Sequence, residues 1–415
     1  MLNTMLLSTK ITLAAAALLP SAAGPAQDAG QDAAPTRSHT VHAETLYTSA
    51  GDSIRNALIV VDDGKIAAVS PGVEATRDAI RAKVVTAGMI DASARINVGL
   101  RSVEQGSEIT PEVESRFGID PFDARWARLA RSGVTTAFVA PLNQNCIGGF
   151  GTVVKTAGGA DLVGRTVESA RMICGAIGSQ PSQRNSPAFG RPSGLYNRRP
   201  TTRMGVEWEW RQSFFDAGQT PAEDANERTR TLQDALAGRV GVFVQAWATQ
   251  DIRTAVFLKE ELMREGFGEL QLVVDCAAEA WREIDMLKRT GTAVVLPPLP
   301  SQGRTRDSAL MPLDTAHRLV DAGVDVCLSA HAGDNPGARL DVQAGFAMRG
   351  GLDRAQALRA VTAVPARVLG IADRVGTVEV GKDADLVLWN GEPFEITSRP
   401  VGVLVGGELV VDPRD

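Results

Sequence analysis

The chain has 415 residues, of which 44% are hydrophobic, so it is long and apolar enough for one large domain and a small one. Its 43 basic and 49 acidic residues leave a net charge of −6. Such a mild acidic excess argues against nucleic acid or an anionic membrane surface as the main partner.

The N-terminal residues 1–26 have the pattern of a secretory signal peptide. Residues 11–19 form an apolar run, and the small residues after it offer cleavage points after Ala23 or Ala26. The run is too short to span a bilayer, so we expect no membrane insertion after cleavage. A polar, Ala-rich linker follows at residues 27–37. We therefore expect a secreted protein of the bacterial periplasm, with a disordered N-terminus as the alternative.

Both ends of the remaining chain are rich in short β-strand patterns. Residues 38–86 contain β-branched runs with a hairpin signal at Asp62-Asp63-Gly64, and residues 375–415 repeat this kind of pattern. We expect the two ends to pair in one small, composite β-domain.

Residues 87–374 instead alternate short apolar strands with helical segments. This alternation predicts a parallel sheet, and its length suits a (β/α)8 barrel. An open, doubly wound sheet is the structural alternative. The sequence contains no GxGxxG or Walker A pattern that would support nucleotide binding.

Five segments of the chain carry a family pattern. They are the stretch beginning TLYTSAG (45–72), VVTAGMIDAS (84–93), the stretch beginning SGVTTAFVAP (132–155), RPTTRMG (199–205), and the closing helix and returning strands (356–394). Together they resemble the amidohydrolase superfamily, and in particular its imidazolonepropionase-like branch. This resemblance implies a (β/α)8 barrel flanked by a small β-sandwich built from both termini. It also implies a metal-dependent hydrolase of carbon–nitrogen bonds.

The chain departs from this family at the positions expected to bind metal. Ser93 and Arg95 stand where the family has two histidines after the first barrel strand, and Gln245 and Cys276 replace histidines after the fifth and sixth. His331 stands near the Asp expected after the eighth. The whole chain has four histidines, His39, His42, His317 and His331. We therefore expect no bound metal and no cofactor, with a single zinc on Cys276, His331 and carboxylates as the alternative.

Three residues are candidates for catalysis without the family's metals: Asp91, Cys276 and His331. Cys276 could act as a nucleophile with His331 as its base, and Asp275 or Asp334 could orient the imidazole. A buried, unreactive cysteine is the alternative interpretation. Cys146, Cys174, Cys276 and Cys327 would permit a disulfide in an oxidising compartment, but the sequence does not pair them.

Cationic and amide side chains predict that the barrel mouth binds a small anionic molecule. The candidate contacts are Arg95, Lys155, Arg203 and Asn145, with an ion pair between Arg95 and Asp91 as the alternative. The loop at residues 169–206 could form a cationic lid or a solvated loop. Its arginines are Arg171, Arg184, Arg191, Arg198, Arg199 and Arg203.

Three functions remain open. The first is an atypical or non-catalytic member of the family that binds a small anion. The second is an active hydrolase of carbon–nitrogen bonds with a metal-free or single-metal site. The third is a structural partner of an active amidohydrolase, or a self-associating subunit.

Overall fold

The computed structural model describes residues 38–96, 104, 106–159, 162–181, 199–299, 309–331 and 339–414. The predicted signal peptide and linker lie outside these ranges, as do residues 182–198 of the predicted cationic lid. Residues 36–415 form one compact unit. Among the described residues, no helix is both long enough and apolar enough to cross a membrane.

Strands from both ends of the described chain share one sheet. Its order is β15-β14-β13-β4-β1-β2-β3. The strands are β1 (His39–Tyr47), β2 (Ile54–Asp62), β3 (Lys65–Ser70), β4 (Ile80–Ala87), β13 (Leu386–Trp389), β14 (Pro400–Val405) and β15 (Glu408–Val411). The predicted hairpin joins β2 to β3, and both Asp63 and Gly64 take the positive φ that such a tight turn requires. Alternate side chains of these strands, such as Val41, Ile59 and Leu388, form its core.

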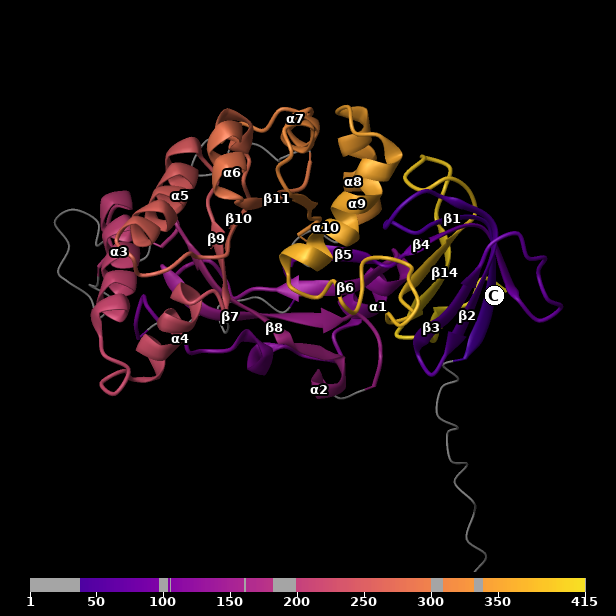
Figure 1. The fold of residues 1–415 in the computed structure, drawn as a ribbon, viewed down its shortest axis with the longest axis horizontal. Coiled ribbons are helices and arrows are strands. Elements are labelled where there is room, and N and C mark those ends of the chain that lie inside the picture. The colour runs from indigo at the N-terminus through magenta and orange to yellow at the C-terminus, as the bar shows by residue number, and fades with distance from the viewer. Residues whose placement is uncertain are drawn as a thin grey trace, which may run out of the picture. The chain divides into compact units, whose positions relative to one another are not determined.

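The second sheet is a nearly closed barrel with the order β12-β11-β10-β9-β8-β7-β6-β5. Its strands are β5 (Met89–Ala94), β6 (Val134–Val139), β7 (Ile147–Lys155), β8 (Thr166–Ala176), β9 (Gly241–Gln245), β10 (Leu272–Asp275), β11 (Ala293–Leu296) and β12 (Val326–Leu328). β12 lies against β5. The predicted TIM-type barrel with a small β-domain from both termini is therefore confirmed (Figure 1).

One barrel strand runs against the others, which corrects the prediction of an all-parallel sheet. β7 pairs antiparallel with both β6 and β8, whereas β8 to β12 pair in parallel. A parallel pair needs a long crossover, but an antiparallel pair does not. Accordingly, β6 reaches β7 through a short loop, and residues 156–165, which end in the four-residue helix α2 (Leu162–Arg165), connect β7 to β8.

Helices surround most of the remaining barrel. Those that begin and end within the described ranges are α1 (Ala124–Arg131), α3 (Arg203–Gln219), α4 (Glu227–Leu236), α5 (Thr249–Arg264), α6 (Ile284–Thr290), α7 (Thr315–Asp321), α8 (Leu340–Arg349), α9 (Arg354–Val361) and α10 (Ala363–Val368). Short 3-10 turns lie at η2 (Ser115–Gly118) and η3 (Ala280–Arg282). His317 lies on α7. The barrel interior is packed, with Phe138 and Phe243 in contact at 4.8 Å between ring centroids.

All four cysteines fall within the described ranges, and each is buried and outside any disulfide. The disulfide that an oxidising compartment would permit is therefore not formed in this structure. Burial raises the pKa of the Cys174 and Cys327 thiols, because an apolar interior disfavours the thiolate.

Candidate functional site

Polar side chains converge where four barrel strands end. We call this group the rim cluster. Active sites of such barrels lie at this carboxyl end of the strands, because the connecting loops of all units meet there. It consists of Asp91, Ser93 and Arg95 from β5 and its end, Gln245 from β9, Asp275 and Cys276 from β10 and its end, and Ser329 and His331 after β12.

Asp91 is fixed by hydrogen bonds within this cluster. Ser329 Oγ lies 2.6 Å from Asp91 Oδ1, and the backbone N–H of Ser93 donates to the same oxygen at 3.2 Å. Ser329 Oγ also accepts from the backbone N–H of His331 at 2.9 Å. Ser329 therefore ties the end of β12 to the end of β5 and helps to close the barrel. Ser329 was not among the residues predicted for the site, although its place at a strand end, two residues before His331, could have indicated it.

Arg95 points across the barrel rather than into solvent. Its Nη2 lies 3.3 Å from Asp275 Oδ2 and 3.6 Å from Cys276 Sγ, and the side chain is 9% exposed. The structure thus supplies Asp275 as an ion-pair partner of Arg95; the alternative predicted from the sequence was Asp91. The 3.3 Å separation is longer than the 2.7–2.9 Å usual for a charged N–H···O bond. The pair is therefore a loose one.

Cys276 lies at the centre of the cluster, beside the imidazole of His331. Cys276 Sγ and His331 Nε2 are 3.5 Å apart, and Gln245 Nε2 donates to the same sulfur at 3.4 Å. Both Cys276 and His331 have positive φ, 57° and 46°. Residues other than glycine adopt this conformation at a cost, and such residues concentrate at functional sites. The indole of Trp247, a residue that the sequence analysis did not single out, meets the His331 ring edge to face at 6.5 Å.

Burial dominates the protonation states in this cluster. It raises the pKa of Cys276 well above its usual value, and the neighbouring Asp275 carboxylate adds to the rise. Burial lowers the pKa of His331 well below its usual value, and repulsion by Arg95 adds to the fall. Burial also raises the pKa of Asp275, against the attraction of Arg95. At neutral pH the site therefore holds a thiol beside a neutral imidazole.

Three of these residues could present donor atoms to one metal ion. A carboxylate oxygen of Asp275, Cys276 Sγ and a ring nitrogen of His331 lie within 4.8 Å of one another. These are donor types that zinc accepts, and a catalytic zinc needs three protein ligands. However, the guanidinium of Arg95 contacts both Asp275 and Cys276, so it brings a positive charge to two of the three donors.

Lys155 lies at the opposite end of the barrel from the rim cluster. Because β7 is antiparallel, its last residue, Lys155, pairs with Thr136 near the start of β6. Lys155 Nζ lies 2.6 Å from Asp385 and 3.1 Å from Asp383, all three buried. Lys155 was predicted to join Arg95 at the barrel mouth, but the structure does not bring the two together.

Arg203 and Asn145 lie on other segments than the rim cluster. Arg203 opens α3 and pairs with Asp251 in the first turn of α5, at 3.3 Å. Asn145 Nδ2 donates to the backbone carbonyls of Glu104 and Ser107 and so fixes the segment before β7. Asp334 and three of the predicted loop arginines, Arg184, Arg191 and Arg198, lie outside the described residues.

Comparisons with known proteins agree with this fold. The model of the amidohydrolase family matches residues 280–410. The chain is 25% identical to amidohydrolase tasK of Hapsidospora irregularis over 86% of its own length, but it covers 39% of that longer protein. It is 26% identical to the imidazolonepropionase of Micrococcus luteus, covering 82% of this chain and 89% of that protein.

A solved structure extends the likeness to three dimensions. An amidohydrolase from Thermotoga maritima superimposes with a TM-score of 0.77 at 26% identity, covering 90% of this chain and 99% of that one. Likeness in sequence and likeness in fold therefore point to the same group of proteins. In sequence and in fold, the chain is therefore similar to the amidohydrolase superfamily, and in particular to its imidazolonepropionase-like branch.

Proposed function

We propose that this chain is an atypical amidohydrolase that binds a small anionic molecule at its rim cluster without the family's histidine metal centre. The observation that carries the proposal is the position of Arg95. Its guanidinium stands where the family has a metal ligand, and it contacts Asp275 and Cys276. A positive side chain at this point disfavours a cation electrostatically and offers a planar fork for a carboxylate.

The donor set of the rim cluster supports this proposal. Ser93, Arg95 and Gln245 occupy three positions at which the family has histidines, so a histidine-rich centre does not fit these side chains. Metal binding by Cys276 would also require the thiolate, and burial raises the pKa of this thiol. The competing possibility is a single zinc ion bound by Asp275, Cys276 and His331, and elemental analysis of the protein distinguishes the two.

The cluster favours a ligand that carries both a carboxylate and an amide. Arg95 makes a loose pair with Asp275, so a ligand carboxylate could replace that partner. Asp275 Oδ1 is buried and has no hydrogen-bond partner among the described residues, so it could accept an amide N–H. N-acyl amino acids and dipeptides carry both groups.

Elemental analysis of the purified, dialysed protein tests the metal part of the proposal. We expect far less than one zinc per chain. About one zinc per chain, retained on dialysis and lost in a Cys276→Ala variant, would contradict it and support the single-zinc alternative. A Cys174→Ala variant, which changes another buried cysteine of the barrel, is the matched control.

Calorimetry with N-acyl amino acids, dipeptides and sugar phosphates tests the ligand part. We expect Arg95→Ala to weaken binding about tenfold or more, since a charge-assisted hydrogen bond contributes about 1.5–3 kcal/mol. Asp275→Asn should strengthen carboxylate binding, because it removes the competing anion. Arg239→Ala, which breaks an exposed pair with Asp234, should change nothing. The proposal fails if no compound binds below millimolar concentration, or if Arg95→Ala keeps the affinity.

The contact between Cys276 and His331 favours a second candidate function, metal-free hydrolysis of carbon–nitrogen bonds. In this scheme His331 Nε2 takes the thiol proton as Cys276 Sγ attacks the amide carbonyl carbon. The carbon–nitrogen bond breaks, the amine leaves with the proton from His331, and water then hydrolyses the thioester. Mass spectrometry should trap an acyl group on Cys276, and Cys276→Ser should abolish turnover while Cys174→Ser does not. Absence of any adduct or turnover sinks this candidate.

Location and partner belong to the same proposal. The apolar run and small residues before position 27 support export to a bacterial periplasm. An active relative as partner is compatible with the likeness to tasK, since that protein extends well beyond the region that this chain covers. Gel filtration of the protein alone and after mixing with a metal-containing relative from the same cell would test the partnership.

A further inference from the structure

A small pocket lies on the outer face of the barrel, away from the rim cluster. Its volume is about 160 Å³, and it lies over β7 and β8 beside the segment that leads into η2. Within β7, Gly151 faces the interior, because a Cβ there would lie 2.4 Å from the Phe138 ring. Its neighbours Phe150 and Thr152 therefore face outward, since side chains alternate along a strand.

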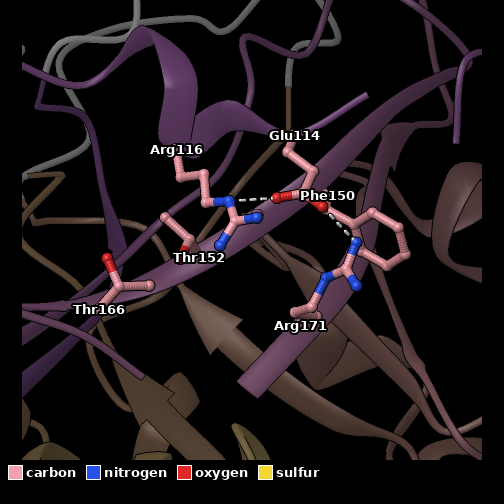
Figure 2. Close-up of a pocket in the computed structure, with 7 residues that line it drawn as sticks. Glu114, Arg116, Phe150, Thr152, Thr166 and Arg171 are labelled. Atoms are coloured by element: carbon pink, nitrogen blue, oxygen red, sulfur yellow. Dashed lines mark hydrogen bonds and ion pairs between the residues drawn. The ribbon is translucent and has the colours of Figure 1, made fainter. Parts of the chain in front are cut away.

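Two arginines and one glutamate dominate this pocket, as Figure 2 shows. Glu114 lies between them. Its Oε1 accepts from Arg171 Nη2 at 2.7 Å, and its Oε2 pairs with Arg116 Nε. The guanidinium of Arg171 also lies over the Phe150 ring, 3.9 Å from its centroid. Carboxylate and ring together hold Arg171 in place, which lowers the entropy that a ligand contact would cost.

The lining is electrostatically unbalanced. Arg116 and Arg171 carry two positive charges, whereas Glu114 is the one acid among the described lining residues. The hydroxyl groups of Thr152 and Thr166 line the same pocket. A guanidinium has five N–H donors in a planar fork, which suits an anion with several oxygens.

We propose that this outer-face pocket binds a small oxyanion, namely the phosphate or the carboxylate group of a small molecule. The volume is below the 300–1,000 Å³ usual for drug-sized ligands, so the oxyanion itself is the recognised group. The antiparallel β7 makes the site possible. A short connection that ends in the four-residue helix α2 joins β7 to β8, and the segment before η2 reaches the outer face. Glu114 comes from that segment, Arg116 from η2 itself, and Arg171 from β8.

Isothermal titration calorimetry with inorganic phosphate at low ionic strength tests this proposal. We expect a dissociation constant of about 1 mM or less, and an Arg171→Met variant weakened about tenfold. A Glu114→Gln variant should bind more tightly, because the competing carboxylate is gone. Arg239→Met is the matched control, since it removes an exposed arginine paired with Asp234 elsewhere on the molecule. Parallel titrations with acetate distinguish a carboxylate preference from a phosphate preference.

The two charge variants make the test decisive. If neither phosphate nor acetate binds below about 10 mM, the proposal is overturned. It is also overturned if Arg171→Met and Glu114→Gln both keep the wild-type affinity, because the arginines then serve only to anchor Glu114. If the Arg171→Met protein fails to fold, an Arg171→Lys variant replaces it in the test. Lysine keeps the positive charge but lacks the planar guanidinium, so this variant should still weaken binding. Binding at the rim cluster should be unchanged in all these variants, so the two sites are tested separately.

Discussion

At the scale of single residues, burial decides what the rim cluster can do. Cys276 and Asp275 are almost fully buried, and His331 lies between them and Trp247. In such surroundings, burying a charged group costs more free energy than burying a neutral polar group. The sulfur therefore keeps its proton and the imidazole stays neutral. Proton transfer between them therefore needs a ligand that stabilises the resulting charges.

The lowered pKa of His331 predicts a loss of stability at mildly acidic pH. An imidazole whose pKa falls on folding is protonated first in the unfolded chain, so folding loses free energy as the pH drops below about 6.5. Through this one residue, the free energy of unfolding changes by at most about 1.4 kcal/mol per pH unit. A His331→Gln variant should lose less stability than the wild type between pH 7 and pH 5. Urea denaturation at both pH values measures this, and equal losses in the two proteins would contradict it.

Strand-end reasoning from the sequence anticipated much of this site. Ser93, Arg95, Cys276 and His331 each follow an apolar run, and parallel strands bring such positions to one edge. Their hydrogen-bond and ion-pair partners were not predictable, because these depend on the directions in which side chains point across the barrel. Asp275 is the example: it ends β10, and its contact with Arg95 after β5 joins two strands that are not neighbours in the barrel.

At the scale of elements, the reversed strand β7 explains why Lys155 was misplaced. A buried apolar run looks the same whether the strand runs up or down, so the sequence predicted the strand but not its direction. Reversal carries Lys155 to the amino-terminal face, where Asp383 and Asp385 lie just before β13. There it joins the barrel to the composite β-domain rather than to a ligand.

Removal of the Lys155 ammonium should therefore cost stability. A Lys155→Met variant leaves Asp385 buried beside Asp383, and breaking a buried pair in this way typically costs about 3–5 kcal/mol. Arg239→Met, at an exposed pair, should cost less than about 1 kcal/mol. Thermal and urea unfolding measure both. A Lys155→Met protein as stable as the control would show that the pair is not needed for the fold.

At the scale of the whole molecule, the composite sheet makes the barrel depend on both ends of the chain. β13 pairs with β4, and β14 continues the sheet while contacting α1 and β6 of the barrel. The matching strand patterns at the two ends predicted this pairing. A single seven-stranded sheet was less predictable, because its order depends on the parallel pairing of β1 with β4.

Truncation before β14 should destabilise the barrel as well as the sheet. A chain that ends at Arg399 exposes β13 and loses the buried side chains of Val403, Leu404 and Val405. We expect it to accumulate in the insoluble fraction, or to melt more than about 5 °C below the full chain. A chain that ends at Asp412 keeps both strands and should behave like the full protein. Circular dichroism and solubility assays distinguish the two, and equal melting would show that the barrel is independent of these strands.

The pairing of β4 with β13 also sets a minimum time for folding during synthesis. β4 ends at Ala87 and β13 begins at Leu386, so 386 − 87 = 299 positions separate the two. At about 5–20 residues per second, a ribosome needs roughly 15–60 s to make that stretch. For this time one edge of β4 lacks its neighbour, and an unpaired edge can recruit other chains. The nascent chain is therefore most vulnerable to aggregation before its last strands emerge, and a chaperone that covers this edge would raise the yield.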